Sequence, residues 1–157
     1  MIPAVQFIIR RYTRRDHDQV VRLHYHALND SGANAGPGEW DEDLNNIEQV
    51  YFDNGGEFLV LEIDKSIIGM GGLLRVNDTT AEIKRMRIQP EYQRRGWGQI
   101  LLTELERRAR DLGYDKLILD TSIKLTAAQK LYERNGYKRI GVSGEGDFKI
   151  ILYEKNI

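Results

Sequence analysis

The chain has 157 residues, the usual size of one domain, and its 23 basic and 24 acidic side chains leave a formal net charge of −1, which gives no general attraction to nucleic acid or to an anionic membrane. The absence of cysteine excludes disulfides, thiolate nucleophiles and cysteine-based zinc sites. No apolar run reaches the ~20 residues of a membrane span, and the first residues lack the pattern of a secretory leader, so we expect a single soluble, cytoplasmic domain.

The first part of the chain predicts one strand and one helix. A β-type run at 7–12 is followed by a capping-box sequence at 13–16, and apolar residues at helical spacing then predict a helix that ends near Leu28. The three histidines of the chain lie in or near this helix. Because His24 and His26 are two residues apart, they point away from each other on a helix, so we expect surface or boundary histidines and no metal site.

A glycine-rich stretch at 31–38 follows, and it has two interpretations: a mobile loop beside an active site, or a plain connection. The acidic run at 39–43 leads into a second predicted helix at 41–52. The helix dipole stabilises acidic side chains in a first turn, which explains the run without any function. Attraction of a cationic amine substrate is the alternative interpretation.

The rest of the chain predicts an antiparallel meander and then alternating helices and strands. The β-type runs between turn residues lie at 57–63, 67–76, 80–88, 116–121, 137–143 and 148–154. Helical spacing predicts further helices at 97–112 and 126–135, each followed by a glycine stop, and the second opens on a capping-box sequence at 126–129. The element order therefore indicates a mixed α/β (α+β) fold, with a central, mostly antiparallel sheet of about seven strands and four helices packed on it.

A basic glycine loop, Gln93-Arg94-Arg95-Gly96-Trp97-Gly98, joins the strand at 80–88 to the helix at 97–112. A helix N-terminus carries unpaired backbone N–H groups and a partial positive charge, and glycine lets a ligand approach the backbone closely. Together with the two arginines, these features favour a phosphorylated ligand such as a pyrophosphate. The alternative is an ordinary strand-to-helix turn with a solvated arginine pair.

Two common phosphate-binding loops do not match this sequence. A dinucleotide fingerprint requires a third glycine where this chain has Leu101. The P-loop pattern of a nucleotide-binding protein occurs nowhere in the chain. NAD and ATP binding by these loops are therefore disfavoured.

The pattern Gln93-x-x-Gly96-x-Gly98, following a strand and Pro90, resembles the coenzyme A loop of the GNAT family of N-acetyltransferases. A second block, Leu131-Tyr132-Glu133-Arg134-Asn135-Gly136-Tyr137, resembles the family's L-Y-x-x-x-G-F segment. The resemblance implies a GNAT fold, with residues 1–157 forming a single N-acetyltransferase domain. It also implies direct transfer of the acetyl group of acetyl-CoA, without a metal, to a primary amine of a small molecule, peptide or protein.

The resemblance assigns coenzyme binding mainly to the backbone. Backbone groups of Met86, Arg87 and Ile88 are expected to take the pantetheine arm and the acetyl carbonyl, on strands that splay apart so that the arm pairs like an added strand. The pyrophosphate and its surroundings are assigned to the loop and the first turn of the helix: Gln93, Arg94, Arg95, Gly96, Trp97, Gly98 and Gln99.

Two side chains are candidates for catalysis. Tyr132 aligns with the tyrosine that donates a proton to the departing thiolate in the family; the alternative is a core tyrosine on an amphipathic helix. Glu82 precedes Gln93 at the spacing of a base in the histone-acetylating branch of the family, where it would act through water. The alternative for Glu82 is an exposed strand residue paired with Lys84 or Arg85.

The sequence departs from the family pattern at two positions. Leu125 stands where many members carry an asparagine that contacts pantetheine, so that contact is lost or is supplied by a neighbour such as Thr126. Trp97 is bulky where a small aliphatic residue is common, and it is expected to cap the core.

A non-catalytic acyl-CoA-binding regulatory module remains an alternative function, as does an unrelated phosphate-binding domain, although the second block argues against the latter. Family members set acceptor specificity in regions that correspond here to 28–51 and 141–148. These regions contain no pattern that identifies the acceptor. Homodimers are common in the family, and the sequence does not decide whether this chain forms one.

Overall fold

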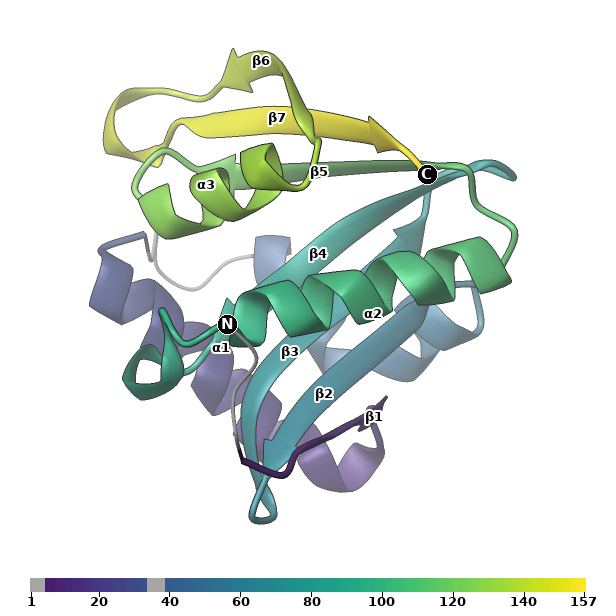
Figure 1. Ribbon diagram of the computed structural model, residues 1–157, viewed down its shortest axis with the longest axis vertical. Helices are drawn as coiled ribbons and strands as arrows, with labels where there is room; N and C mark the ends of the chain where they lie inside the picture. The colour runs from purple at the N-terminus through teal and green to yellow at the C-terminus, as the bar shows by residue number, and fades with distance from the viewer. Residues whose placement is uncertain (1–4, 34–38) are drawn as a thin grey trace.

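The computed structural model of the protein describes residues 5–33 and 39–157. Most of the predicted glycine-rich loop at 31–38 lies outside the described residues, so its two interpretations stay open. The described strands form one seven-stranded sheet in the order β1-β2-β3-β4-β5-β7-β6 (Figure 1). Every neighbouring pair is antiparallel except β4 and β5, which confirms the mostly antiparallel sheet expected from the sequence.

The strand and helix bounds are close to those predicted. The strands are β1 (Ile8–Arg11), β2 (Glu57–Ile63), β3 (Ser66–Arg75), β4 (Thr80–Ile88), β5 (Lys116–Ser122), β6 (Lys138–Ser143) and β7 (Ile150–Asn156). The α-helices are α1 (His17–Ser31), α2 (Trp97–Asp111) and α3 (Thr126–Arg134). In the described ranges, each helix is too short or too polar to cross a membrane.

The second predicted helix has a different form from the one expected. It is a 3-10 segment, Glu39–Asn45, followed by a short π-helix, Glu48–Phe52. The apolar face was predicted correctly, because Leu44, Ile47 and Tyr51 are all buried.

One of the two predicted capping boxes is present. Thr13 and Asp16 form the first, where the Asp16 carboxylate accepts the Thr13 backbone N–H at 2.8 Å. The second is wrong: the cap residue of α3 is Leu125, which makes no side-chain cap. The Gln129 side chain instead donates to the carbonyls of Ser122 and Ile123 at the end of β5.

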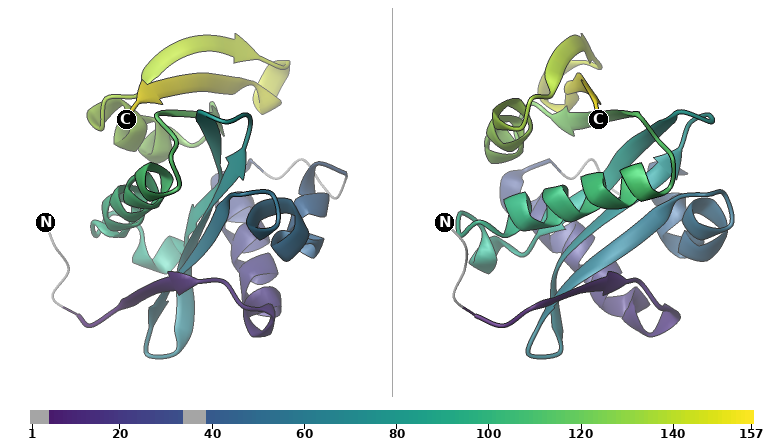
Figure 2. Two further views of the ribbon diagram at one scale, coloured as in Figure 1. Left: turned by 90° about the vertical axis from the view of Figure 1, so that its right-hand side faces the viewer. Right: turned by 45° about the vertical axis from the view of Figure 1, so that its right-hand side comes forward.

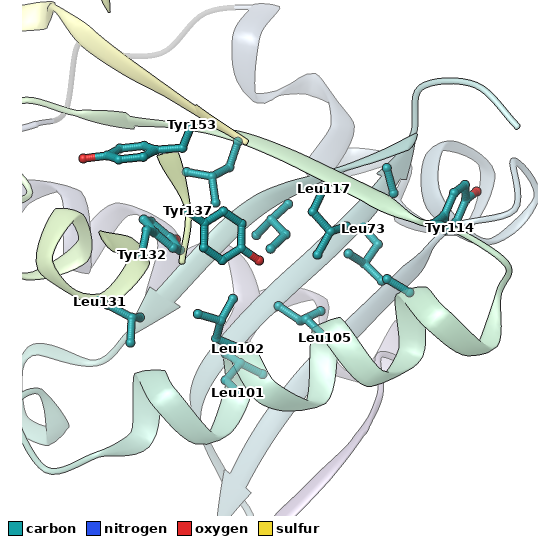
Figure 3. Packing of buried hydrophobic residues seen from close by; sticks show 14 of the residues in the cluster. Leu73, Leu101, Leu102, Leu105, Tyr114, Leu117, Leu131, Tyr132, Tyr137 and Tyr153 are labelled. Carbon is teal, nitrogen blue, oxygen red and sulfur yellow. The ribbon is translucent and has the colours of Figure 1, made fainter. Parts of the chain in front are cut away.

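Helices cover both faces of the sheet. α2 and α3 lie on one face, and α1 with the helical segment 39–52 lies on the other (Figure 2). The first face holds a core cluster in which Leu101, Leu102 and Leu105 of α2 meet Tyr132 and Tyr137 (Figure 3). Both faces are therefore buried, as the apolar central strands require.

The feature that positions the site is a bulge in β4. Met70 pairs with Arg87 and Gly72 with Lys84, so β4 holds one more residue than β3 between these pairs. Arg85 has the left-handed φ of 59° that a bulge of this kind requires. Pairing of β4 with β5 stops at Glu82 and Ile118. From Ile83 onward, no described strand pairs with this edge of β4, so the two parallel strands part.

Candidate active site

A cavity of about 280 Å³ opens where β4 and β5 part. Its lining comes from β4, β5 and α3, from the end of α1 with the residues just after it, from the segment 39–52, and from the start of β7. The lining side chains that carry charge or a phenol are Asp41, Glu82, Lys84, Arg85, Arg87, Asp120 and Tyr132. The structure therefore brings both candidate catalytic residues and the backbone of Met86 and Arg87 to a single cavity.

The basic glycine loop lies directly after β4 and a single 3-10 turn at Pro90–Tyr92. Gly96 has a φ of 92° and is the cap residue of α2, where no side chain satisfies the first N–H groups. Arg94 also has a positive φ, of 63°, and both Arg94 and Arg95 are exposed. No described carboxylate forms an ion pair with either arginine. The loop thus offers free backbone donors and unpaired positive charge, which suit a phosphate group.

Three side chains near the loop have structural partners. Trp97 is 2% exposed and packs edge-on against Phe7, so it belongs to the core as expected and only its backbone can reach a ligand. The Gln93 amide donates to the Ile88 carbonyl at 3.0 Å. Gln99 pairs with Asn135 at the end of α3. These contacts order the loop rather than point into the cavity.

Tyr132 projects from α3 into the buried region between α3 and the sheet, beside Tyr137 (Figure 3). Its side chain is 4% exposed and lines the cavity. No described residue makes a hydrogen bond with its hydroxyl. Burial raises the pKa of Tyr132, and Asp120 adds to the rise, whereas the positive charge of Arg87 acts against it. The phenol is therefore protonated at neutral pH and available as a proton donor.

Glu82 is half-buried and lines the cavity from the last residue of β4 that pairs with β5. No described cation forms an ion pair with it, so the alternative of a pair with Lys84 or Arg85 is not observed. Burial raises the pKa of Glu82, although Lys84 partly opposes that rise. A half-buried carboxyl with a raised pKa has the properties of a general base near neutral pH.

The acidic run at 39–43 has a structural role at two of its positions. The guanidinium of Arg85 donates to Asp43, with Nε 3.0 Å from Oδ2. Asp41 accepts from the His24 imidazole Nε2 and the Tyr25 hydroxyl, each at 3.0 Å. Both carboxylates are thus committed to partners inside the protein. This finding argues against the interpretation that they attract a cationic amine.

The histidines were expected at helix surfaces or boundaries, and one of them is placed differently. His24 is fully buried, and burial lowers its pKa to about 4, so the ring is neutral at physiological pH. His26 is exposed and lies 2.8 Å from a Glu91 carboxylate oxygen. Within the described ranges, no group of three or more histidine or acidic side chains is arranged to hold a metal ion.

Two cavity residues were missed or only partly anticipated from the sequence. Arg87 was expected to contribute its backbone, but its side chain also lines the cavity. Asp120 is an exposed acid in an otherwise apolar strand, and it faces the same space. The sequence held one signal for these residues, namely three basic side chains within 84–87 on a predicted central strand. Strands that are buried on both faces rarely carry charge, so such a cluster indicates a site.

The departure at Leu125 is visible in the structure. The Leu125 side chain lines the cavity, and the Thr126 side chain is exposed. The cavity wall is therefore apolar where many family members present an amide.

Comparison with known proteins identifies the family. The model of the acetyltransferase (GNAT) family matches residues 20–137, more than half of the chain. The protein belongs to this family, as the two sequence blocks predicted.

Two curated relatives differ in how much of them the chain covers. Human N-acetyltransferase 8 is 34% identical over 107 residues, which are 64% of this chain and 47% of that protein. The uncharacterized N-acetyltransferase YjgM of Escherichia coli (strain K12) is 26% identical over 152 residues, or 91% of each chain. The chain thus spans about half the length of the human relative and most of the bacterial one.

Solved structures share the fold. A GNAT acetyltransferase from Staphylococcus aureus Mu50 has a TM-score of 0.87 at 23% identity, covering 96% of this chain and 99% of that one. The PaiA N-acetyltransferase from Thermoplasma acidophilum, solved in complex with coenzyme A, has a TM-score of 0.80 at 21% identity and covers 98% of this chain and 100% of that one. The predicted GNAT fold is confirmed.

Proposed function

We propose that the protein is an acetyl-CoA-dependent N-acetyltransferase that acts on a primary amine of a small molecule or peptide. The observation that carries this proposal is the cavity at the parting of β4 and β5, which Tyr132 and Glu82 both line beside the unpaired part of β4. Family membership and the names of the relatives, which are N-acetyltransferases, support the activity.

The residues present fit coenzyme A as the acetyl carrier. The free edge of β4 at Met86–Ile88 can pair with the amides of a pantetheine arm. The N-terminus of α2, with Gly96, Gly98 and the unpaired Arg94 and Arg95, suits a pyrophosphate. The Thermoplasma neighbour was solved with coenzyme A, which supports the assignment. The chain holds this co-substrate through its backbone, as the resemblance implied.

In the proposed reaction, the amine nitrogen forms a C–N bond with the acetyl carbon, and the C–S bond breaks with its electron pair on sulfur. Glu82 accepts the proton that the amine loses, directly or through water. Tyr132 donates its phenolic proton to the sulfur, and solvent restores it. A backbone N–H near Arg87–Ile88 stabilises the negative charge that develops on the carbonyl oxygen. The products are the acetylated amine and the free thiol of coenzyme A.

Three further properties belong to the same proposal. Residues 1–157 act as one domain, which the continuous seven-stranded sheet supports. The protein works in the cytoplasm. Homodimers are common in the family, and the molar mass of the purified protein in solution tests whether this chain forms one.

Thermal unfolding with acetyl-CoA tests the coenzyme site, with NADH and ATP as controls. A ligand at 100 times its Kd stabilises by about 2.7 kcal/mol, which is several degrees for a domain of this size. We expect acetyl-CoA to raise the melting temperature, and NADH and ATP to leave it unchanged. Release of thiol on addition of amines then separates an enzyme from a non-catalytic acyl-CoA-binding module, since the module would show the shift without the release.

A further inference from the structure

Arg87 is half-buried, and the described residues use little of its hydrogen-bonding capacity. Its Nη1 donates to the Met86 carbonyl at 3.0 Å. Its Nε is buried and has no hydrogen-bond partner, and no described residue accepts from Nη2. A guanidinium has five N–H donors, and among the described residues only the Met86 carbonyl accepts from one of them. A buried N–H without a partner is costly, so a ligand that accepts from Arg87 is the expected explanation.

The charged neighbours of Arg87 do not supply that partner. The Asp43 carboxylate accepts a hydrogen bond from Arg85, and the Asp41 carboxylate accepts from His24 and Tyr25. Asp41 and Asp120 favour the charged guanidinium only from a distance, because neither lies within ion-pair range of Arg87. Burial, reinforced by Arg85, lowers the pKa of Arg87 to about 10. The side chain is still positively charged at neutral pH.

The position of Arg87 indicates which ligand meets it. Its side chain lines the cavity from β4, and the cavity also reaches Leu28 of α1 on one face of the sheet and Tyr132 of α3 on the other (Figure 2). Ala33, just after α1, lines the cavity beside Leu28, so this part of the wall is apolar. The pyrophosphate donors lie elsewhere, on the exposed loop before α2. The unpaired cation therefore faces the space left for the acceptor.

We propose that the Arg87 guanidinium binds a carboxylate of the acceptor, so that the substrate class is a small primary amine that carries a carboxylate, as an amino acid does. This inference rests on the proposed function and adds the acceptor class. Planar guanidinium groups bind carboxylates through paired N–H donors, which a lysine ammonium cannot reproduce. The carboxylate provides the missing counter-ion, and its contact with Arg87 orients the amine at the other end of the small molecule.

The first experiment compares matched acceptors on the wild-type protein. Each common L-amino acid is assayed beside its α-carboxamide, with acetyl-CoA and thiol release as the readout. Losing one partner of a buried, hydrogen-bonded charge pair costs at least about 30-fold in affinity. We expect the best carboxylate substrate to exceed its carboxamide by that factor in kcat/KM. Equal rates for both members of every pair would overturn the proposal and leave the acetyltransferase function intact.

Variants then assign the preference to Arg87. Arg87→Gln should lower the ratio of kcat/KM for the carboxylate to kcat/KM for its carboxamide about 30-fold or more, mainly through a higher KM for the carboxylate. Arg87→Lys should recover part of the preference. Arg110→Gln, a change of an exposed arginine on α2, is the matched control and should behave as wild type. An equal loss of kcat with both acceptors would overturn the proposal and would mean that Arg87 acts on Tyr132 or the departing thiolate.

A binding measurement separates this inference from the function on which it rests. With coenzyme A present, the preferred amino acid should raise the melting temperature of the wild type and not of Arg87→Gln. If acetyl-CoA stabilises the protein but no amino acid is acetylated or adds to the shift, the carboxylate class is wrong and the coenzyme site stands. If acetyl-CoA gives neither a shift nor any thiol release, the proposed function itself fails.

Discussion

Gln99 and Asn135 exchange two side-chain hydrogen bonds, each 2.8 Å long, between positions 36 residues apart. Gln99 lies in the first turn of α2 and Asn135 at the end of α3, so the pair joins the glycine loop before α2 to the block that carries Tyr132. Close packing adds to the link, since a Cβ on Gly98 would lie 3.3 Å from Leu131 Cδ2. The two blocks of the family pattern are therefore physically coupled.

Loss of this amide pair should destabilise the protein in a coupled way. Gln99→Ala and Asn135→Ala should each lower the free energy of unfolding by about 1 kcal/mol or more, because the remaining amide keeps part-buried, unpaired groups. The double variant should show a coupling energy of about 0.5 to 3 kcal/mol in urea unfolding. Lys130→Ala, at an exposed site on α3, is the control and should change stability by less than about 0.5 kcal/mol. Strict additivity of the two changes would contradict the account.

The glycine loop can be tested by two variants with the same backbone penalty. Gly96 and Gly113 have φ values of 92° and 94°, at opposite ends of α2. Alanine at either position costs about 1 to 2 kcal/mol of stability, since a Cβ disfavours this conformation. Only Gly96→Ala should also weaken acetyl-CoA binding, by about tenfold or more, because it disturbs the donors at the helix N-terminus. Equal coenzyme affinities by calorimetry would remove the loop from the site.

Tyr132→Phe should reduce turnover without harming the fold. The hydroxyl makes no hydrogen bond with any described residue, so its removal should change stability by less than about 0.5 kcal/mol. Proton donation by a positioned side chain contributes about 10²-fold or more to rate, and kcat should fall by that amount. Coenzyme affinity should stay the same. Unchanged kcat in this variant would exclude the acid role of Tyr132.

Glu82→Gln should change the pH dependence of both rate and stability. Because burial raises its pKa, wild-type kcat/KM should rise with pH as Glu82 loses its proton. In the pH profile of kcat/KM, this rise at low pH is separate from the rise at higher pH that deprotonation of the acceptor amine causes. The rise at low pH should disappear in Glu82→Gln. The rate at the optimum should fall at least about tenfold. Asp115→Asn, at an exposed carboxylate outside the regions that set acceptor specificity, is the control. If Glu82→Gln and the control variant showed the same rise of kcat/KM at low pH, Glu82 would be excluded as the base.

The stability effect of Glu82→Gln has a definite sign. The folded carboxyl has a higher pKa than the unfolded one, so the folded protein holds that proton more tightly. Below the ordinary value of 4.5 both states are protonated and the charge has no cost. As the pH rises through the folded pKa, the wild type must bury a charged carboxylate. The variant should therefore gain stability relative to the wild type above that pH, measured by unfolding across a pH series.

Local signals predicted most of the fold. Runs of β-type residues between turn residues predicted the bounds of β2 to β4, and helical spacing with Gly113 predicted those of α2. The irregular helical segment at 39–52 was predicted as a regular helix, since its apolar positions suit both forms. The second capping box failed because Gln129 found better acceptors at the end of β5. Local patterns of this kind carry no information about competing tertiary partners.

The glycine loop before α2 and Tyr132 were candidates from the sequence because they lie in short sequence blocks. The pairing of Arg85 with Asp43 could not, since it depends on a bulge that brings together residues 42 positions apart. The same bulge governs the surroundings of Arg87, which the sequence offers only as one more basic strand residue. The charged residues on this central strand indicate a site in the sequence. Only the tertiary structure shows which of them have partners.

The most direct test of the central claim is amine-dependent release of thiol from acetyl-CoA, followed together with mass spectrometry of the acceptor. The account predicts equal amounts of free thiol and acetylated amine with the wild type, and a loss of about 10²-fold or more in Tyr132→Phe at full coenzyme binding. Stabilisation by acetyl-CoA with no release across a panel of small and peptide amines would contradict it. That result would make the protein an acyl-CoA-binding module without transferase activity.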